Sequence, residues 1–341
     1  MMNPITQRRL YQFKANKRGY YSFLIFVGIF LVTLCAEFIA NDKPLLVSYK
    51  GNYYFPVLKS YPETTFGGTF ETATNYRDPF VQNLIKPNGF IIWAPIPFSI
   101  NTVNYALNSP APSPPTVDNL LGTDDQGRDV LTRSLYGFRI SILFGLALTL
   151  GASIIGIFTG SLQGYFGGRF DLLMQRFIEI WSNLPVLYLL IILSSMIEPN
   201  FWWLLAIMLT FSWMTLVGVV RAEFFRTRTL DYVRAAEALG VPSSRIIWRH
   251  MLPNAMVAVI TYLPFILNGS IATLTSLDFL GFGLPPGSAS LGELITQAKN
   301  NIQAPWLGLT AFFSISVLLS LLIFTGEAVR DAFDSRKIKI G

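Results

Sequence analysis

Two residue types that often catalyse reactions or bind metals are nearly absent from this sequence. The chain has one histidine, His250, and one cysteine, Cys35. A single cysteine excludes an internal disulfide and a cysteine-built metal site, and a single histidine excludes a histidine cluster. A hydrolase built on a nucleophile, a histidine and an acid would depend on His250, which we interpret instead as a helix-surface residue at a protein contact. We therefore expect neither catalytic residues nor a bound metal.

A nucleotide-binding loop is also missing. The pattern G-x-x-x-x-G-K-[ST], whose backbone N–H groups hold phosphates, occurs nowhere in the 341 residues. We therefore expect this chain to bind no ATP in that way and to carry no cofactor of its own.

The segment with the most informative spacing is Thr229–Pro253, TLDYVRAAEALGVPSSRIIWRHMLP. Asp231 is a suitable N-cap for a short helix, and Gly240 can adopt the left-handed conformation that ends it. Ser243 can then cap a second helix that ends before Pro253. The spacing predicts two short helices that meet at a glycine.

The side chains of these two helices suit a contact with another protein. Ala235, Ala236 and Ala238 make part of the first helix narrow enough to fit a groove. Arg245 and Arg249 give the second helix a charged face. By itself, such a segment is more often a loop at the membrane surface than a docking element, so both interpretations stay open at this point.

A membrane-spanning structure must position these helices. Hydrophobic residues make up 52% of the chain and charged residues only 13%, whereas a soluble domain carries roughly 25% charged residues. Six apolar stretches approach the ~20 residues needed to cross a bilayer. They are Tyr20–Ala40, Phe138–Gly160, Phe177–Ile197, Phe201–Val220, Ala255–Leu277 and Leu307–Gly326. The sequence therefore predicts an all-α polytopic membrane protein with six transmembrane helices.

The positions of the basic residues predict that both termini lie in the cytoplasm. Lys and Arg are retained on the cytoplasmic side of a membrane, and the N-terminal tail carries only basic charges: Arg8, Arg9, Lys14, Lys17 and Arg18. With six crossings, the arginine-rich segment 221–254 and the C-terminal tail lie on the same side. The net charge of +6 is explained by this topology, so we expect no nucleic-acid partner.

Four regions follow from these spans. Residues 1–40 form a cytoplasmic tail and the first helix, and residues 41–137 form an extracytoplasmic insert. Residues 138–330 hold the remaining helices, and residues 331–341 form a cytoplasmic tail. Within the insert, apolar residues on both sides of Lys50-Gly51 predict a small β-hairpin over residues 45–57.

Two features of the spans predict how the helices pack and bend. Gly156, Gly160 and Gly164 are four residues apart, so they share a helix face that another helix can approach closely. Asn183 and Pro185 predict a kink in the third span, where the carbonyl freed by the proline needs another partner.

The spans give no sign of a built-in energy source. Ion-coupled carriers usually place ionisable residues near the middle of the membrane, but the fourth, fifth and sixth stretches contain no Asp, Glu, Lys, Arg or His. Transport against a gradient would need an external motor. The alternative is a passive channel or an ion-coupled secondary carrier, which would work as a single purified chain.

Segment 229–253 resembles the cytoplasmic coupling loop of binding-protein-dependent ABC importer permeases, whose pattern is E-A-A-x3-G-x9-I-x-L-P. Ala235, Ala236, Gly240, Leu252 and Pro253 match this pattern in register. Arg234 replaces the usual glutamate and His250 the usual isoleucine. These departures are similar to the variation found in the peptide-transporter branch of the family.

Two further stretches resemble the same branch. LGTDDQGRDVLTRSLYGFRIS, Leu121–Ser141, is similar to the segment before the second span of dipeptide and oligopeptide permeases. Its residues alone predict a turn-rich approach to the membrane, in which Gly122 and Gly127 bend the chain while Arg128 and Asp129 stay in water.

The second stretch, LDFLGFGLPPGSASLGELI at Leu277–Ile295, resembles the segment S-F-L-G-L-G…P-P…W-G, with Asp278 in place of Ser and Leu291 in place of Trp. These departures and the enlarged first loop are similar to microcin C/oligopeptide importer permeases.

The resemblance implies a fold, partners and site residues. The fold would be the type I ABC importer transmembrane domain with an enlarged first periplasmic loop. Its partners would be a second homologous permease subunit, an ABC ATPase with two nucleotide-binding domains that binds ATP and Mg, a periplasmic peptide-binding protein and membrane lipid. The chain would be a non-enzymatic subunit that imports peptides, microcin C-like peptides included, across the bacterial inner membrane. Its coupling loop, 221–254, would act through Asp231, Arg234, Ala235, Ala236, Gly240, Arg245, Arg249, Leu252 and Pro253.

Overall fold

The computed structural model describes residues 4–333 as two compact units. The helical unit consists of residues 4–27, 141–286 and 316–333, and the insert unit consists of residues 28–140 and 287–315. Residues 334–341, most of the predicted C-terminal tail, lie outside the described residues.

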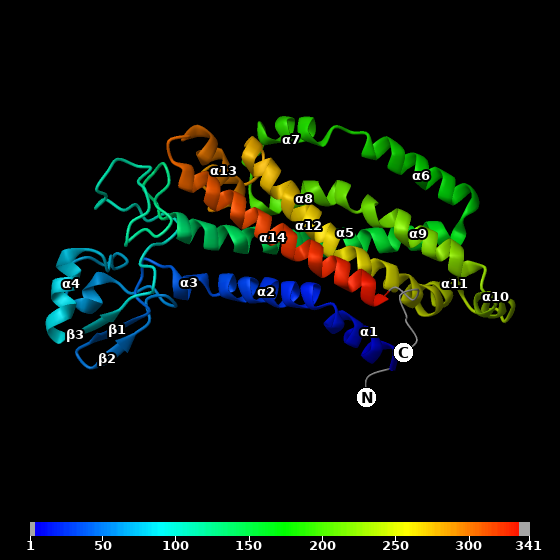
Figure 1. Ribbon diagram of the computed structural model, residues 1–341, viewed down its shortest axis with the longest axis horizontal. Helices are drawn as coiled ribbons and strands as arrows, with labels where there is room; N and C mark the ends of the chain where they lie inside the picture. Colours follow the sequence, from blue (N-terminus) through cyan, green and yellow to red (C-terminus); the bar gives the residue numbers. More distant parts are fainter. Residues whose placement is uncertain (1–3, 334–341) are drawn as a thin grey trace. The chain divides into compact units, whose positions relative to one another are not determined.

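Helices account for nearly all of the helical unit (Figure 1). Those wholly within it are α1 (Pro4–Ala15), α6 (Gly168–Ser182), α7 (Val186–Ser194), α8 (Phe201–Ser212), α9 (Met214–Arg228), α10 (Asp231–Ala238), α11 (Ser243–Arg245), the π-helix η3 (Ile246–Met251) and α12 (Leu252–Leu280). Three helices contribute residues to both units, namely α2 (Lys17–Leu34), α5 (Val130–Phe166) and α14 (Pro305–Phe333).

The predicted polytopic α-helical fold is confirmed. Five helical segments are long and apolar enough to cross a membrane: Lys17–Leu34, Val130–Phe166, Phe201–Arg228, Ser243–Leu280 and Pro305–Phe333. The bent pair α6 and α7 makes a sixth if it counts as one span. The first span is shorter than predicted, because α2 ends at Leu34 and a separate helix α3 (Ala36–Ile39) follows.

The break between α6 and α7 lies at the predicted kink. The two helices meet at an angle of 60°. Pro185 has no N–H to donate to the carbonyl four residues earlier, and that carbonyl, on Trp181, accepts a hydrogen bond from the Leu184 N–H instead (3.2 Å). The Asn183 amide donates to the Glu179 carbonyl (2.6 Å), which satisfies a second carbonyl at the end of α6.

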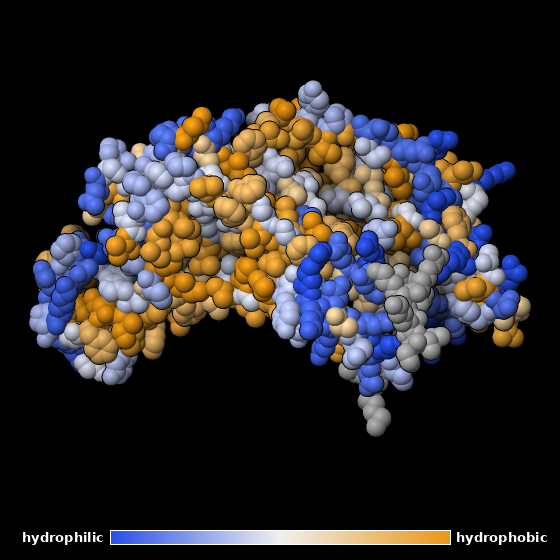
Figure 2. Space-filling model, viewed as in Figure 1, coloured by the Kyte–Doolittle hydropathy of each residue, from blue (hydrophilic) through white to orange (hydrophobic). Residues whose placement is uncertain are grey.

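Apolar side chains also cover much of the outer surface of the helical unit, in orange in Figure 2. Ile154 on α5 is 69% exposed, Leu173 on α6 is 71% exposed and Trp202 on α8 is 73% exposed. Water would disfavour such a surface, whereas lipid tails solvate it. This surface fits a chain that lies in a membrane.

The insert unit is built around a small antiparallel sheet. Its strands are β1 (Leu46–Tyr49), β2 (Asn52–Tyr54) and β3 (Gly89–Ile92), in the order β2-β1-β3. Lys50 and Gly51, both with positive φ, form the turn of the predicted hairpin. The third strand was not predicted, because it comes from residues almost 40 positions later in the sequence.

The 3-10 helices η1 (Glu63–Phe66) and η2 (Lys86–Asn88) and the helix α4 (Pro79–Ile85) pack beside this sheet. The unit also contains the helix α13 (Leu291–Asn300). Val47 and Tyr49 of β1 pack with Phe66, Tyr76 and Ile85 in a buried cluster. The insert therefore has a core of its own rather than being an irregular loop.

Candidate functional site

Helix α10 ends in the glycine elbow that the sequence predicts. Gly240 has φ +73°, a left-handed conformation in which a side chain would be strained. The Gly240 N–H donates to the Glu237 carbonyl (3.0 Å), and the Val241 N–H donates to the Ala236 carbonyl (3.1 Å). This pair of bonds is the Schellman motif, which satisfies the last carbonyls of a helix.

The start of α10 differs from the prediction. Leu230 occupies the N-cap position and no side chain caps the helix, so the expected capping role of Asp231 is wrong. Asp231 is the first helical residue, where its carboxylate faces the positive end of the helix dipole. The carboxylate still favours the helix, although through charge rather than through a capping hydrogen bond.

One face of α10 packs against its own chain. Val233 is fully buried and Ala236 is 8% exposed. Both belong to a cluster with Phe224 of α9, Ile246 of η3 and Ala255 of α12. Ala236, predicted to face a partner, therefore anchors α10 to the helices that continue from it on both sides.

The opposite face of α10 is exposed. Asp231, Arg234 and Ala235 all point away from the cluster, and the Leu239 side chain just after the helix is 83% exposed. Burying an exposed leucine is favourable, so an apolar side chain in this position suits a contact with another surface.

The second predicted helix does not stop before Pro253. Ser243 is the first residue of α11 without a capping bond, and the chain then passes through the π-helix η3 directly into α12. Pro253 lies in the first turn of α12, directly after the π-helix, and it has no N–H to donate to a carbonyl of that preceding turn. The predictions for Ser243 and Pro253 are therefore wrong, and the elbow is joined rigidly to a long helix.

The remaining predicted coupling residues lie along this joined helix. Arg245 and Arg249 are exposed and Leu252 is half-buried. The Tyr232 hydroxyl of α10 accepts a hydrogen bond from the Asn254 amide (2.6 Å). Tyr232 and Asn254 thus tie α10 to the start of α12, a contact that no sequence spacing had indicated.

The glycines of α5 lie against α9, the helix that leads into α10. A Cβ atom at Gly156 would come within 2.6 Å of the Trp213 carbonyl oxygen, and one at Gly164 within 2.3 Å of the Phe224 Cβ. At Gly160 it would approach the Val217 carbonyl oxygen to 2.9 Å. These three residues let the backbones of α5 and α9 approach more closely than any side chain would allow.

A bidentate ion pair fixes α9 from another direction. The Arg221 guanidinium donates to both carboxylate oxygens of Asp171 on α6, over 2.5 and 2.6 Å. Asp171 is buried, and such a paired geometry is the strongest kind of salt bridge. The 50 residues between the partners explain why the sequence gave no signal for it.

A hydroxyl-lined pocket of about 300 Å³ opens among the helices of this unit. Its polar lining comes from Ser212, Thr215, Tyr262, Ser270 and Thr273, and no charged residue lines it. A Cβ at Gly269, which also lines the pocket, would meet no atom within 4 Å. The small size of Gly269 therefore leaves open space instead of serving helix packing.

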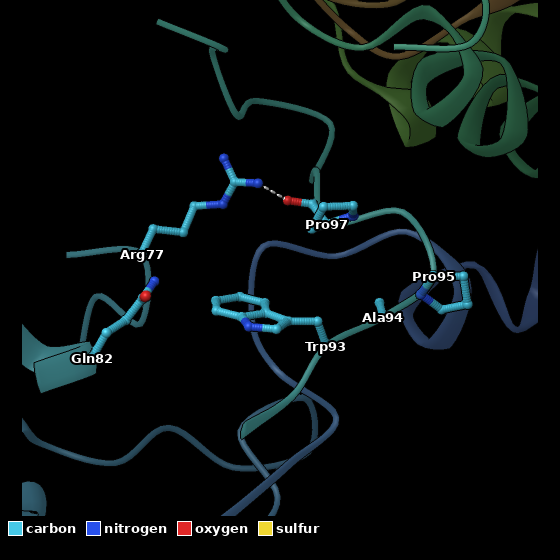
Figure 3. Close-up of a pocket in the computed structure, with 6 residues that line it drawn as sticks. All are labelled: Arg77, Gln82, Trp93, Ala94, Pro95 and Pro97. Atoms are coloured by element: carbon cyan, nitrogen blue, oxygen red, sulfur yellow. Dashed lines mark hydrogen bonds between the residues drawn. The ribbon is translucent and has the colours of Figure 1, made fainter. Parts of the chain in front are cut away.

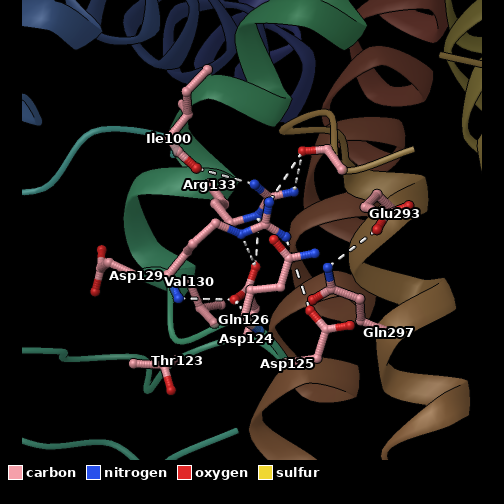
Figure 4. Close-up of polar contacts among 12 residues, drawn as sticks. Ile100, Thr123, Asp124, Asp125, Gln126, Asp129, Val130, Arg133, Glu293 and Gln297 are labelled. Carbon is pink, nitrogen blue, oxygen red and sulfur yellow. Dashed lines mark hydrogen bonds and ion pairs between the residues drawn. The ribbon is translucent and has the colours of Figure 1, made fainter. Parts of the chain in front are cut away.

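The insert unit holds a second polar cluster, drawn in Figure 4. The Asp124 carboxylate, fully buried, lies 2.7 Å from Nε of Arg128 and 3.2 Å from Nε of Arg133. Asp129 caps α5 by accepting a hydrogen bond from the Thr132 N–H (2.8 Å). Arg128 and Asp129 are 4% and 1% exposed, so the prediction that they stay in water is wrong.

Arg133 connects two of the stretches that resemble peptide permeases. Its guanidinium donates to the Gly287 and Ser288 carbonyls, over 3.1 and 2.7 Å, and to the Ile100 carbonyl over 3.1 Å. The bends at Gly122 and Gly127, with φ +75° and +77°, bring the acidic and basic side chains together. Burial pairs these charges because an isolated buried charge would be too costly.

Among residues 4–333, no group of three His, Cys, Asp or Glu side chains is placed to hold a metal ion.

Comparisons with known proteins agree with these features. Residues 152–339 match the family model for the binding-protein-dependent transport system inner membrane component. The chain is 61% identical over 336 residues to the inner membrane ABC transporter permease protein YejE of Escherichia coli (strain K12), covering 98% of both chains. It is 57% identical over 359 residues to the peptidoglycan transport system permease protein YejE of Agrobacterium fabrum, covering 98% of this chain and 94% of that one.

A more distant relative is the oligopeptide transport system permease protein OppC of Lactococcus lactis subsp. lactis. It is 36% identical over 229 residues, which cover 66% of this chain and 78% of that protein. The membrane spans and the family match together establish a membrane component of a transport system. The chain belongs to the family of binding-protein-dependent transport system inner membrane components.

Proposed function

We propose that this chain is the permease subunit of an ATP-driven importer that carries peptides across the bacterial inner membrane. Its partners would be a second homologous permease, an ABC ATPase with two nucleotide-binding domains and a periplasmic peptide-binding protein. Both termini and segment 221–254 would face the cytoplasm. ATP and Mg would be bound by the ATPase.

The two-sided geometry of α10 carries the proposal for coupling. Val233 and Ala236 fix the helix to its own chain, while Arg234, Ala235 and Leu239 are exposed. A loop that only connected two spans would not need a packed inner face and an apolar outer side chain. A helix that transmits force needs both, because it must hold a partner and pass its motion on.

The path of that motion can be followed through the packing. α10 shares its cluster with α9 and α12, and α9 is in turn held by the α5 glycines and by Asp171. Displacement of α10 would therefore shift helices rather than bend a flexible loop. ATP can drive this shift only if the ATPase binds the two states of the permease with different affinity.

The substrate class rests on two observations. Relatives are named for oligopeptide, dipeptide and peptidoglycan transport, and the pocket of the helical unit offers hydroxyls without charge. Neutral hydrogen-bonding groups suit peptide backbones of many sequences. Microcin C-like peptides fall within this class.

The decisive experiment replaces Gly240 in the complete transporter. Gly240→Val places a β-branched residue in a left-handed conformation that costs about 1–2 kcal/mol for any side chain. We expect ATP-driven uptake of a labelled peptide into proteoliposomes to fall about tenfold or more, with normal amounts of protein in the membrane.

The matched control is Gly240→Asn, because asparagine tolerates the left-handed conformation. We expect this variant to keep most of the uptake. Normal uptake by a fully incorporated Gly240→Val variant would show that the elbow does not couple the ATPase to the permease.

A further inference from the structure

The insert unit contains a pocket that the proposed function does not use. It has a volume of about 470 Å³ and is shown in Figure 3. The pocket lies beside the sheet, between helix α4 and the residues that follow strand β3. Its lining residues are Arg77, Gln82, Trp93, Ala94, Pro95 and Pro97.

Arg77 brings a half-buried positive charge to this pocket without a carboxylate partner. Its guanidinium donates to the Pro97 carbonyl and lies over the Phe98 ring, 4.7 Å from the centroid. Among the described residues no carboxylate comes within 4 Å of it. Burial lowers the pKa of Arg77, and the charge of Asp42 opposes this shift without cancelling it.

An arginine in this setting is poised to accept an anion. A guanidinium is always charged at physiological pH, and removing it partly from water is costly unless an opposite charge compensates. Its planar fork of N–H groups matches the two oxygens of a carboxylate. The remaining N–H groups of Arg77 supply that fork at the pocket.

Two neighbouring side chains, Trp93 and Gln82, offer a ligand in this pocket one hydrogen-bond donor and one acceptor. The Trp93 indole N–H has no acceptor among the described residues, and in Figure 3 the ring lies below the Arg77 guanidinium and to the right of the Gln82 amide. The Gln82 amide group donates to the Tyr76 carbonyl (3.2 Å), which leaves its own oxygen as an acceptor. The remaining walls, Ala94, Pro95 and Pro97, are apolar.

We propose that this pocket binds the C-terminal residue of a peptide, with its carboxylate on Arg77 and the Trp93 N–H, its backbone N–H on Gln82, and its side chain against the prolines. The volume falls within the range of roughly 300–1,000 Å³ typical of small-ligand sites. The affinity for a carboxylate follows from the pocket alone. Only the assignment of that carboxylate to a peptide rests on the proposed function.

The acceptor at Gln82 argues against a simple inorganic anion. Phosphate would place further negative charge against that carbonyl oxygen, whereas the terminal residue of a peptide presents an N–H there. An acidic patch on a partner protein is the other alternative, because its carboxylates would match the guanidinium in the same way. These alternatives become outcomes of the test.

The test measures binding to the full-length chain in nanodiscs, without ATPase or transport, so that a failure of the proposed function does not affect it. The ligands are N-acetyl-Ala-Ala-Phe as the free acid, the same peptide as its C-terminal amide, and inorganic phosphate. Isothermal titration should show binding of the acid and about tenfold or more weaker binding of the amide.

Substitutions test whether the peptide binds in this pocket. Arg77→Gln should abolish the difference between acid and amide, and Trp93→Phe should weaken the acid several-fold while keeping the ring. Lys86→Gln, which removes an exposed positive charge of the same insert, should bind like the unmodified chain. Because acid and amide are first compared on the unmodified chain, the test does not depend on the folding of a variant.

Three results would overturn the proposal. They are equal binding of acid and amide, binding of phosphate as tightly as the acid, and acid binding that survives Arg77→Gln. A periplasmic binding protein that associates with the unmodified chain but not with Arg77→Gln, while neither peptide binds, would assign the pocket to an acidic protein surface instead.

Discussion

The buried charge cluster of the insert unit and the exposed face of α10 in the helical unit use polar residues in opposite ways. Asp124, Arg128 and Arg133 pair with one another and with nearby backbone carbonyls away from water, although Nη2 of Arg128 and Nε of Arg133 make no hydrogen bond with the described residues. Arg234 and Leu239 have no such contacts within their own chain and remain exposed. The charges of the first arrangement are paired within the chain, whereas the second arrangement gains from a partner.

This difference separates residues that stabilise the fold from residues that contact a partner, which the family resemblance does not distinguish. All three stretches that resemble permeases contain charged residues and glycines, so the sequence alone gives them equal weight. Because its charged residues are buried, the stretch at Leu121–Ser141 stabilises the fold of this chain. Exposure shows that the stretch at Thr229–Pro253 faces outward.

The largest expected effect on stability comes from removing one arginine of the buried charge cluster. Arg133→Ala leaves Asp124 with one of its two arginines and removes one donor from each of three backbone carbonyls. Breaking a buried ion pair in this way costs about 3–5 kcal/mol of unfolding free energy. Thermal unfolding in detergent should show a large fall in the midpoint temperature.

The matched control is Arg176→Ala, which breaks the exposed pair Arg176–Glu179, with side chains 75% and 54% exposed. It should change stability by less than about 0.5 kcal/mol. Equal effects of the two variants would remove the distinction between a completed cluster and a solvated surface.

An effect of intermediate size is expected from a substitution on the exposed face of α10. It should change binding to the ATPase and leave the stability of the chain unchanged. Leu239→Glu should leave the unfolding free energy within about 0.5 kcal/mol, because the side chain is 83% exposed. It should weaken co-assembly with the ATPase by roughly tenfold, since an apolar contact is replaced by a charge. Quantitative co-purification would measure the change.

Leu58→Glu provides the comparison, because Leu58 of the insert is also highly exposed, at 73%. It should leave ATPase binding unchanged. If Leu239→Glu also co-purified with the ATPase at normal levels, α10 would have to be read as a surface loop after all.

The smallest effect concerns Asp125, at the edge of the buried cluster. Burial, followed by the charge of Asp124, raises the pKa of Asp125 above its ordinary value of 3.8. The folded chain therefore favours the protonated carboxyl, which contributes stability at low pH that is lost as pH rises from 3.8 through the raised pKa. The side chain is 40% exposed, so the change is modest.

Asp125→Asn cannot ionise and should show a flatter dependence of unfolding temperature on pH in this window. Measuring both proteins from about pH 4 to pH 7 covers it. Parallel curves would mean that Asp125 stays effectively solvated and does not belong to the cluster.

Local features were predictable from the sequence. The apolar stretches correspond to the spanning helices, the Lys50-Gly51 turn forms the hairpin, and Gly240 ends α10 in the left-handed conformation. Each depends on residues within a few positions of one another, where helix, strand and turn preferences act directly.

Features that depend on distant residues were not predictable. β3 joins the hairpin from far along the chain, Arg221 pairs with Asp171, and Arg133 finds the Gly287 carbonyl. Arg128 pairs with the nearby Asp124 and also donates to the distant Gly287 carbonyl, so its burial became visible only in the structure. Asp231 and Ser243 were mislocated by one residue each, because an adjacent residue takes the capping position.

The reach of Arg133 has a consequence for how the protein is made. The Gly287 carbonyl is synthesised 154 residues after Arg133, which at 5–20 residues per second is a delay of roughly 8 to 30 s. During that interval the nascent chain carries a guanidinium for which two of the final acceptors, the Gly287 and Ser288 carbonyls, do not yet exist. A chain whose translation stops before residue 287 lacks these carbonyls, so Arg133 then has only Asp124 and the Ile100 carbonyl as partners.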